Sequence, residues 1–331
     1  MPHPDYIPGV LMGTGIGDAL GMPFEARGCD VHPMLKNWTD KLFHPGNYHK
    51  VEAGHWTDDT EMSVALAGSI VSHGKFKGEE VAKVYTQWFL GKPTGMGGST
   101  RDALQRLSDL GHGEAWDQFW DKQGTEFEDR EAVGSGTAMR AAPLGVLCYS
   151  RPDMLRRMCR VDAFITHADM EAYAASLAIS SATLGLIMHQ DNSTDVKNSM
   201  ATPVMNFIQA QMVTVKDTLV YQGMEAAFAN FRDTPEYFCD VYAGRWGNAW
   251  QIVSTSLFCL LRAWRHSFED AVEMAIKMGG DADTRGAIVG ALKGAQVGMG
   301  GIPGYYKTGV ADSGMLEDLD IRLWALGMGR E

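Results

Sequence analysis

Two short acidic stretches, far apart in the chain, carry the residue types that could do chemistry. They are Trp56-Thr57-Asp58-Asp59-Thr60 and Gly279-Gly280-Asp281-Ala282-Asp283-Thr284. Each places two carboxylates and a threonine just before a segment with helical apolar spacing, which predicts acids at a helix N-terminus. A helix cap explains either stretch alone, because acids favour the positive end of the helix dipole. Two matching stretches indicate a shared site instead.

A site built from both stretches would gather as many as five carboxylates, namely Glu25, Asp58, Asp59, Asp281 and Asp283. Like charges a few ångströms apart repel and force protonation unless cations lie among them. Carboxylate and hydroxyl oxygens, with no Cys or His in either motif, favour two Mg²⁺ or Mn²⁺ ions over Zn²⁺ or copper. Two ions roughly 3.5–4 Å apart would orient a substrate diol and lower the pKa of a bridging water.

Two segments of the chain carry glycine stripes at helical spacing. Glycine recurs at every fourth position within residues 9–22 and again within 286–298. On a helix this spacing forms a bare stripe, which costs helix stability but lets another backbone approach closely. Membrane helix dimers carry such stripes too, yet Lys293 and Gln296 interrupt the second, and neither segment is long enough to span a bilayer. We expect two central, closely packed helices. The stripes are Gly9, Gly13, Gly17 and Gly21, and Gly286, Gly290, Gly294 and Gly298.

The rest of the chain predicts an all-α fold in a single domain, residues 1–331. No sustained period-two alternation and no βαβ spacing interrupts the helical pattern. Pro23 should end the first helix. Residues 30–56 are predicted to be irregular, and 111–132 to be a loop or a short amphipathic helix. Further helices are expected at about 60–73, 78–90, 100–109, 152–163, 168–189, 200–212, 215–231, 249–263 and 267–278. An apolar helix is also expected after Arg140, ending at Leu147.

Composition narrows the possible classes of function. A formal charge of -12 argues against a nucleic-acid groove or an anionic membrane surface, because both need clustered Lys and Arg. No apolar run approaches the ~18 residues of a membrane span, and no secretory signal opens the sequence. The five scattered cysteines form no CxxC pair and indicate reduced, mostly buried thiols. We therefore expect a cytoplasmic protein.

Four segments, taken in order, resemble the ADP-ribosylglycohydrolase family, also called the dinitrogenase-reductase-activating glycohydrolase family. They are Gly17 to Gly21 leading to Glu25, Trp56 to Thr60, Gly134 to Gly145, and Gly279 to Gly290. The paired acidic motifs at this separation are specific, whereas the glycine segments alone would be weak. The resemblance implies an all-α orthogonal bundle with a binuclear Mg²⁺ or Mn²⁺ centre.

The resemblance also implies roles for single residues. Glu25 would bind metal or act as a base, and Asp283 would bridge the two ions. The distal ribose of ADP-ribose would place its hydroxyls on the metals, and water would displace the group at its anomeric carbon. The implied catalytic residues are Glu25, Asp59 and Asp283, and the implied metal ligands are Thr57, Asp58, Asp59, Asp281, Asp283 and Thr284.

Three further features are expected near the substrate. Gly134-Ser135-Gly136 precedes a helix and resembles a phosphate cradle, because free backbone N–H groups and the helix dipole favour anions. Gly97-Gly98-Ser99-Thr100 also precedes a helix, and either caps it or contacts the substrate. His167 would by default be a buried structural histidine, but the family has a Thr-His segment near its ligand here. Asp18 is expected to support the site by packing or hydrogen bonding rather than by ligating metal.

The sequence departs from the family pattern beside these motifs. Arg285 replaces a usual asparagine and is expected to bring a cation next to the centre. Ser135 stands where asparagine is commoner, Val133 where some members stack adenine on tyrosine, and Ala282 where a threonine is common. Gly95 stands where arginine-directed bacterial members often carry an aspartate. The absence of that aspartate bears on the leaving group more than on the reaction.

The sequence thus predicts a binuclear-metal hydrolase that removes ADP-ribose from a modified acceptor, with protein arginine favoured. One alternative is a catalytically silent ADP-ribose-binding module, motivated by Arg285, Ser135 and Gly95. Another is a hydrolase of O-acetyl-ADP-ribose or a similar conjugate. The expected partner is an ADP-ribosylated protein or a small ADP-ribose conjugate.

Overall fold

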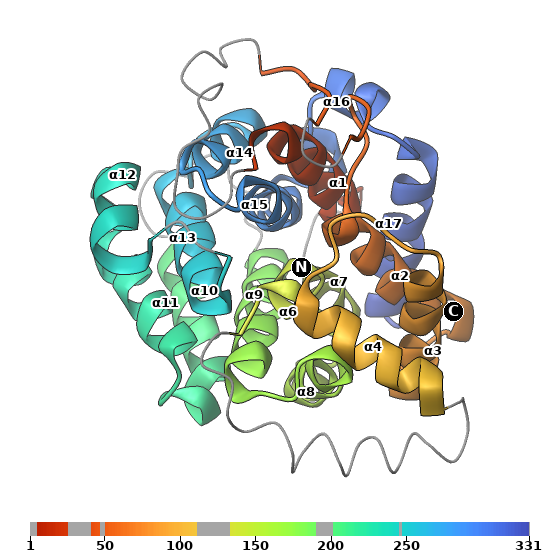
Figure 1. The fold of residues 1–331 in the computed structure, drawn as a ribbon. Helices are drawn as coiled ribbons and strands as arrows, with labels where there is room; N and C mark the ends of the chain where they lie inside the picture. The colour runs from red at the N-terminus through yellow and green to blue at the C-terminus, as the bar shows by residue number, and fades with distance from the viewer. Residues whose placement is uncertain are drawn as a thin grey trace.

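Every regular element in the described part of the protein is helical. The computed structural model describes residues 5–25, 41–46, 50–110, 133–189, 201–244 and 247–330. The helices pack around a centre formed by α1 (Val10–Gly21), α9 (Met170–Met188) and α15 (Ala282–Val297) (Figure 1). The all-α prediction is confirmed. Residues 111–132, the turn at 191–193, Cys29, and residues 30–40 and 47–49 of the predicted irregular segment lie outside the described residues.

The two glycine-striped helices, α1 and α15, touch backbone to backbone. A Cβ placed on Gly17 would lie 2.0 Å from the Gly286 carbonyl oxygen, and one on Gly290 would lie 2.1 Å from the Gly13 carbonyl oxygen. Neither position has room for a side chain, so only glycine permits this crossing. The predicted close packing is confirmed. Its consequence is that α1, with Asp18 on it, lies against the start of α15.

The N-terminus of α2 (Asp58–His73) is capped from α1. Thr57, at the N-cap position, makes no side-chain cap of its own. Instead Asp18 Oδ2 accepts hydrogen bonds from the backbone N–H groups of Thr57 (3.0 Å) and Thr60 (3.1 Å) and from the Thr60 hydroxyl (2.6 Å). The acids do begin a helix, as predicted, and Asp18 has the supporting role expected of it. Since Asp18 caps the helix, Asp58 and Asp59 need not do so.

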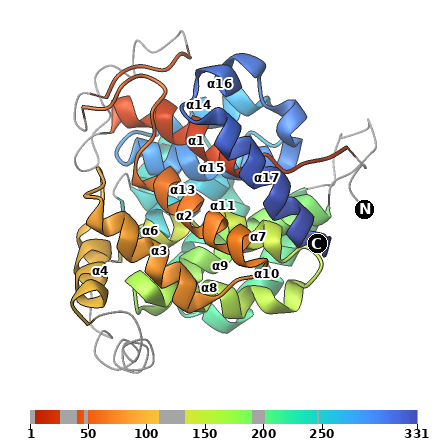
Figure 2. The same ribbon diagram turned by 90° about the vertical axis from the view of Figure 1, so that its right-hand side faces the viewer.

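The C-terminal helices α16 (Gly304–Gly309) and α17 (Ser313–Gly327) were not predicted. Helix α17 lies along α1 and α2 at the surface (Figure 2). Its buried Asp320 accepts hydrogen bonds from the backbone N–H groups of Leu11 (2.9 Å) and Met12 (3.0 Å), at the start of α1. The last helix therefore caps the first, in the same way as α1 caps α2.

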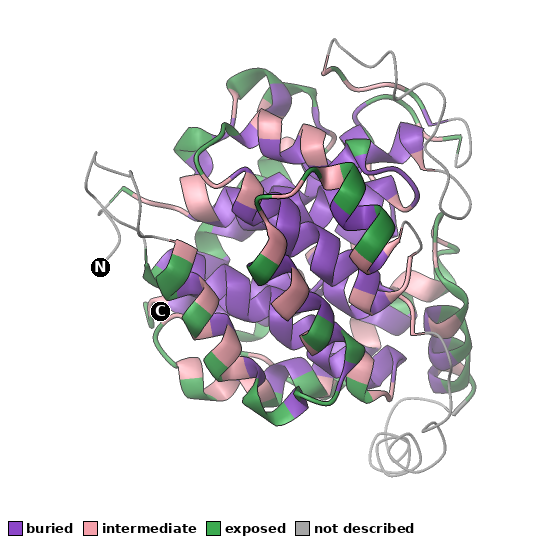
Figure 3. Ribbon diagram, turned by 90° about the vertical axis from the view of Figure 1, so that its left-hand side faces the viewer, coloured by how far each residue is buried: buried purple, intermediate pink, exposed green. Residues whose placement is uncertain are grey.

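Burial decreases from the central helices to the peripheral ones (Figure 3). The inner helices are buried almost all round, whereas the outer ones keep an exposed side. By length and composition α9 could cross a membrane, so the expectation that no apolar run reaches that length was wrong. However, 89% of its apolar window is buried against other parts of the fold. The described cysteines, Cys148, Cys159, Cys239 and Cys259, are free and buried, as predicted.

Most predicted helices are present, with ends shifted by a few residues. The predicted 215–231 helix begins later, because Thr218 caps it by accepting from Tyr221 N. The remaining helices are α3 (Gly78–Leu90), α4 (Gly98–Leu110), α6 (Gly136–Met139), α7 (Ala142–Leu147), α8 (Leu155–Thr166), α10 (Ala201–Gln211), α11 (Leu219–Asn230), α12 (Pro235–Phe238), α13 (Ala249–Arg262) and α14 (Phe268–Lys277), with short 3-10 or π turns η1 (Met22–Phe24), η3 (Pro152–Met154), η4 (Met212–Val215), η5 (Cys239–Ala243) and η6 (Met299–Gly301).

Candidate active site

A cavity of about 310 Å³ lies where the starts of α2, α4, α6 and α15 converge. Both acidic stretches face it, although they are far apart in the chain. One wall, here called the carboxylate wall, consists of Glu25, Asp58, Asp59, Asp281, Asp283 and Thr284. The other, here called the glycine wall, includes Gly97, Gly98, Ser99, Gly134, Ser135, Gly136 and His167. Of the predicted site residues only Thr57 does not line the cavity.

The carboxylate wall concentrates buried negative charge. Asp58, Asp59 and Asp283 are each at most 8% exposed. Burial raises the pKa of all three well above the usual range, and neighbouring carboxylates raise it further. Glu25 is among the neighbours that raise the pKa of Asp283. These groups are therefore close enough to repel one another, as the shared-site prediction requires.

Thr57 and Asp18 lie behind the carboxylate wall and hold it. The Thr57 hydroxyl donates to Asp18 Oδ1 (2.9 Å) and approaches Asp59 Oδ2 (3.3 Å). Burial raises the pKa of Asp18 to about 6, against the opposing effect of the hydrogen bonds from Thr60 and Thr57. Thr57 is thus next to the carboxylate wall, but its hydroxyl proton is already donated to Asp18.

The carboxylate wall has the donor chemistry of a site for hard cations. Its side chains present only oxygen atoms, and Asp59 Oδ1 is buried without a hydrogen-bond partner in the part of the chain that the structure describes. Mg²⁺ and Mn²⁺ prefer such oxygen donors. Over the same residues, no group of three or more His, Cys, Asp or Glu side chains is already arranged to hold an ion. The donor set fits the predicted ions, and their binding stays a prediction.

The glycine wall offers hydrogen-bond donors at the start of α4. Gly98 is the first residue of this 13-residue helix, and Ser99 is its second. The first N–H groups of a helix have no partner within it, and together with the helix dipole they favour anions. The N-terminus of α4 is therefore a candidate anion site on this wall.

The predicted phosphate cradle at Gly134–Gly136 lines the cavity, but one of its N–H groups is already used. Helix α6 has only four residues, so its dipole adds little. The Ser135 N–H donates to the Gly247 carbonyl oxygen (3.1 Å) and is not available to a ligand. The Ser135 hydroxyl instead approaches Asp281 Oδ2 (3.4 Å), so Ser135 links the glycine wall to the carboxylate wall.

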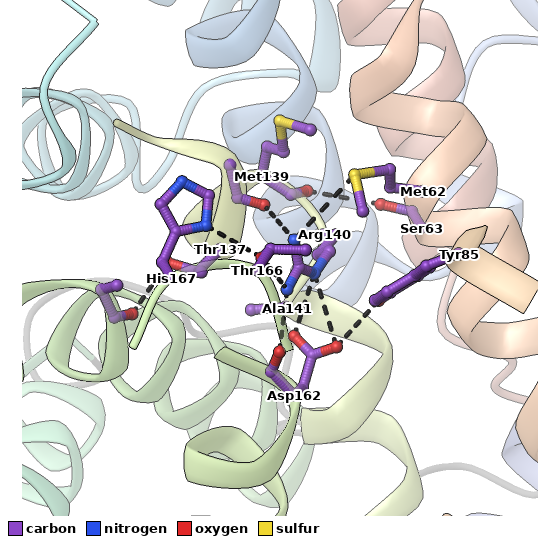
Figure 4. A network of polar contacts seen from close by, with 12 residues as sticks. Met62, Ser63, Tyr85, Thr137, Met139, Arg140, Ala141, Asp162, Thr166 and His167 are labelled. Atoms are coloured by element: carbon purple, nitrogen blue, oxygen red, sulfur yellow. Dashed lines mark hydrogen bonds and ion pairs between the residues drawn. The ribbon is translucent and has the colours of Figure 1, made fainter. Parts of the chain in front are cut away.

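His167 belongs to the glycine wall and lies next to Gly136. Its side chain is 7% exposed, and a Cβ built on Gly136 would lie 3.1 Å from its Cε1. Its Nδ1 lies 2.9 Å from the Thr166 hydroxyl oxygen (Figure 4). Both predicted roles, ligand contact and loop support, are compatible with this position.

The profile of the family described as ADP-ribosylglycohydrolase matches residues 3–331. The chain belongs to this family. Among its relatives is the ADP-ribosyl-[dinitrogen reductase] glycohydrolase of Rhodospirillum rubrum, 25% identical over 95% of this chain and 90% of the relative. The ADP-ribosylarginine hydrolase Tri1 of Pseudomonas putida is 26% identical over 95% of this chain and 76% of its own length. A solved structure titled ADP-ribosylglycohydrolase-related protein complex superposes with a TM-score of 0.73 at 25% identity, covering 97% of each chain.

In this member of the ADP-ribosylglycohydrolase family, the backbone of Gly95 packs directly against the carboxylate wall. Its φ is +95°, and a Cβ here would lie 2.3 Å from Asp58 Oδ1. A non-glycine residue would be strained and would displace Asp58. An aspartate at this position could not be accommodated without moving the loop.

Arg285 does not bring its cation to the cavity, contrary to the sequence expectation. Its side chain is fully buried, donating from Nε to Thr255 Oγ1 (3.0 Å) and from Nη1 to the Gly279 carbonyl oxygen. The reason is helical geometry: two residues after Asp283, the side chain points to the far side of α15. Arg285 therefore anchors the Gly279 end of the second acidic stretch.

Gly247 and Met139 line the cavity but were not predicted. A Cβ on Gly247 would lie 2.7 Å from Asp281 Oδ2, so this backbone closes directly over that carboxylate. The only sequence signal was a Gly-Asn pair before α13, which is typical of many turns.

Proposed function

We propose that this protein hydrolyses the glycosidic bond between ADP-ribose and a modified acceptor, with protein arginine as the favoured acceptor. The observation that carries the proposal is the meeting of both acidic stretches on one wall of a single cavity. Family membership supports the class of reaction, and the names of the R. rubrum and P. putida relatives support the kind of substrate.

The proposed reaction breaks the bond from the anomeric carbon of the distal ribose to the acceptor nitrogen. An oxygen from water forms the new bond to that carbon. One proton of the water goes to a base, and the leaving nitrogen takes up a proton. Glu25 is the candidate base, because it lines the cavity beside Asp283 and a positioned carboxylate can accept a proton from water.

The carboxylate wall would hold the two predicted Mg²⁺ or Mn²⁺ ions. Asp58, Asp59 and the adjacent Thr57 would serve one ion, and Asp281, Asp283 and Thr284 the other. Such ions, when bound, polarise substrate hydroxyls and water and offset carboxylate charge. Asp18, Ser135 and Arg285 keep these ligands in place through the hydrogen bonds described above.

The glycine wall would hold the ADP part of the substrate. The start of α4 presents backbone N–H groups to the cavity and is suited to a diphosphate. Binding energy from this remote part of the substrate would orient the distal ribose against the carboxylate wall.

The test is release of ADP-ribose from arginine-, serine- and thymidine-linked substrates and from O-acetyl-ADP-ribose, with Mg²⁺ or Mn²⁺ present. We expect release, most rapidly from the arginine conjugate. Asp59→Ala and Asp283→Ala should each abolish turnover, whereas Asp318→Ala, at an exposed position on α17, should not. Full activity in either cavity variant would contradict the proposal. Binding of ADP-ribose without release from any substrate would identify a silent binding module.

A further inference from the structure

A second cavity, of about 440 Å³, lies between α14 and the segment formed by α12 and η5. At its base are two buried side chains, Cys239 at the start of η5 and Met278 at the end of α14. None of the residues that line it also lines the candidate active site. The second cavity is therefore a separate feature, which the proposed function does not use.

Both walls of the second cavity are held on α13. Phe238, at the end of α12, stacks on Phe258 of α13 with ring centroids 4.2 Å apart. Cys259, the next residue on α13, donates from Sγ to Met278 Sδ (3.1 Å) at the end of α14. The second cavity thus lies between two elements that share one buried support.

Each wall continues along the chain to Asp281, a member of the carboxylate wall. From α14, Met278 leads through Gly279 and Gly280 directly to Asp281. From η5, the chain leads to Gly247, where a Cβ would lie 2.7 Å from Asp281 Oδ2. A change in the separation of the two walls would therefore reach Asp281 from both sides.

The charges of the second cavity are balanced on one wall only. On α14, Asp270 Oδ1 and Glu273 Oε2 lie 3.1 and 2.8 Å from Lys41 Nζ. Lys277 pairs with Glu273 as well. On the opposite wall Glu236 is exposed, and it forms no ion pair within the part of the chain that the structure describes. A cationic group of a ligand would complement Glu236.

The base of the second cavity suits an aromatic body. Cys239, Met274 and Met278 present a thiol and two thioethers to it. Methionine side chains adapt their shape and make favourable contacts with aromatic rings. Ligand pockets typically combine a mainly apolar lining with a few polar groups that fix the orientation of the ligand. The second cavity has this combination, with its carboxylates around a sulfur-rich base.

We propose that the second cavity is a regulatory site for a small ligand with an aromatic body and one cationic group, whose binding between the two walls restrains Asp281. A ligand shifts a conformation only if it binds one arrangement more tightly than another. A ligand that contacts both α12 and α14 meets this condition, because it fits one separation of the walls best. The site does not depend on the proposed function, whereas its effect on turnover does.

The probe is tryptamine, and the first readout is the methyl spectrum of the full-length protein labelled with ¹³C at its methionine methyl groups. The two signals of interest are assigned by their absence in Met274→Leu and Met278→Leu. Tryptamine should shift both signals in a saturable manner. No shift of either signal up to the solubility of tryptamine would overturn the proposal.

The expected charge preference is tested with tryptophol and indole-3-propionate, which carry the same ring with a neutral or an anionic group. Tryptamine should bind about two- to fivefold more tightly than tryptophol, the usual range for one ion pair near solvent, and indole-3-propionate most weakly. Glu236→Gln should remove this preference, and Glu317→Gln, at an exposed position on α17, should keep it. An unchanged preference in Glu236→Gln would contradict the assigned cationic group.

A cavity-filling variant tests the location. Met274→Trp should abolish the tryptamine-induced shift of the Met278 signal, because the larger ring occupies the second cavity. Met188→Trp, which changes a methionine that is 39% exposed at the end of α9, is the control and should leave the shift intact. Wild-type affinity in Met274→Trp would mean that tryptamine binds elsewhere.

Hydrogen exchange followed by mass spectrometry tests the link to Asp281. Saturating tryptamine should slow exchange in residues 279–283 and leave α8 unaffected. Binding with unchanged exchange in residues 279–283 would overturn the regulatory role. The rate of ADP-ribose release should also change with tryptamine in the wild type but not in Met274→Trp. If no substrate is hydrolysed under any condition, the proposed function fails, while the methyl spectra and the exchange data still decide the site.

Discussion

Buried charges occur both in the carboxylate wall and in a second cluster, here called the Arg140 network, which consists of Tyr85, Arg140, Asp162 and Thr166. Only the Arg140 network balances its charge. Arg140 faces Asp162, and each of its N–H groups has an acceptor. In the wall, Asp58, Asp59 and Asp283 face other carboxylates, which together with burial raise their pKa values. One buried oxygen of Asp59 has no partner in the described residues.

The comparison distinguishes a cluster that holds neighbouring groups in place from a cluster that is suited to binding a ligand. Burying a polar group without a hydrogen-bond partner costs free energy, and nearly all buried polar groups in folded proteins have such a partner. The Arg140 network is complete and needs no ligand. The carboxylate wall is incomplete until protons or cations offset its charge. Removing one member should therefore have opposite effects on stability in the two clusters.

The largest effect is expected from Arg140→Met. It leaves the Asp162 carboxylate buried without its cation, which should lower the free energy of unfolding by about 3–5 kcal/mol. Urea unfolding measures the change. Arg157→Met, at an exposed position on α8, is the control and should cost little. Similar losses in the two variants would mean that the buried ion pair does not have the stabilising role assigned to it.

Asp59→Asn should act in the opposite direction. In EDTA it removes one of several mutually repelling buried charges, so the free energy of unfolding should rise by about 1–3 kcal/mol. Asp318→Asn, which removes an exposed carboxylate on α17, should leave stability nearly unchanged. A clear loss of stability in Asp59→Asn would show that the wall is not under charge repulsion.

Asp320 is an intermediate case, because it accepts hydrogen bonds at the start of α1 but has no cation. Burial raises its pKa from the ordinary value of 3.8 to about 7. The folded state then binds the proton more tightly than the unfolded state, so this stabilisation is full below about pH 4 and is lost as the pH rises through 7.

The corresponding measurement compares wild type with Asp320→Asn, which does not titrate at this position. The difference in unfolding free energy, wild type minus variant, should fall by about 1 kcal/mol per pH unit between pH 5 and 7. A difference that is constant over this range would contradict the raised pKa.

The sequence was sufficient for the features that depend on residue type and spacing. The glycine stripes predicted that α1 and α15 would be central, closely packed helices. The two acidic stretches, with the resemblance to a family, predicted which residues would share a cavity. Regular periodicity predicts helices well, because one buried face repeats along the chain.

The remaining features depend on contacts between distant segments. Nothing around Asp18 or Asp320 shows that each caps a different helix, because the partner N–H groups lie far away in sequence. Gly247 lines the cavity only through its approach to Asp281. The direction of the Arg285 side chain could have been predicted, because a residue two positions after Asp283 lies on the opposite face of a helix. A residue-by-residue comparison with the family pattern does not take the turn of the helix into account.

Thermal unfolding with and without divalent cations tests most directly that the carboxylate wall is a site completed by cations. Relative to EDTA, Mg²⁺ or Mn²⁺ at about 100 times its dissociation constant should stabilise the wild type by about 2.7 kcal/mol, raising its melting temperature by several degrees. Asp59→Asn and Asp283→Asn should lose most of this shift, and Asp320→Asn should keep it. The same melting temperature for wild type in EDTA and in millimolar metal would contradict the account.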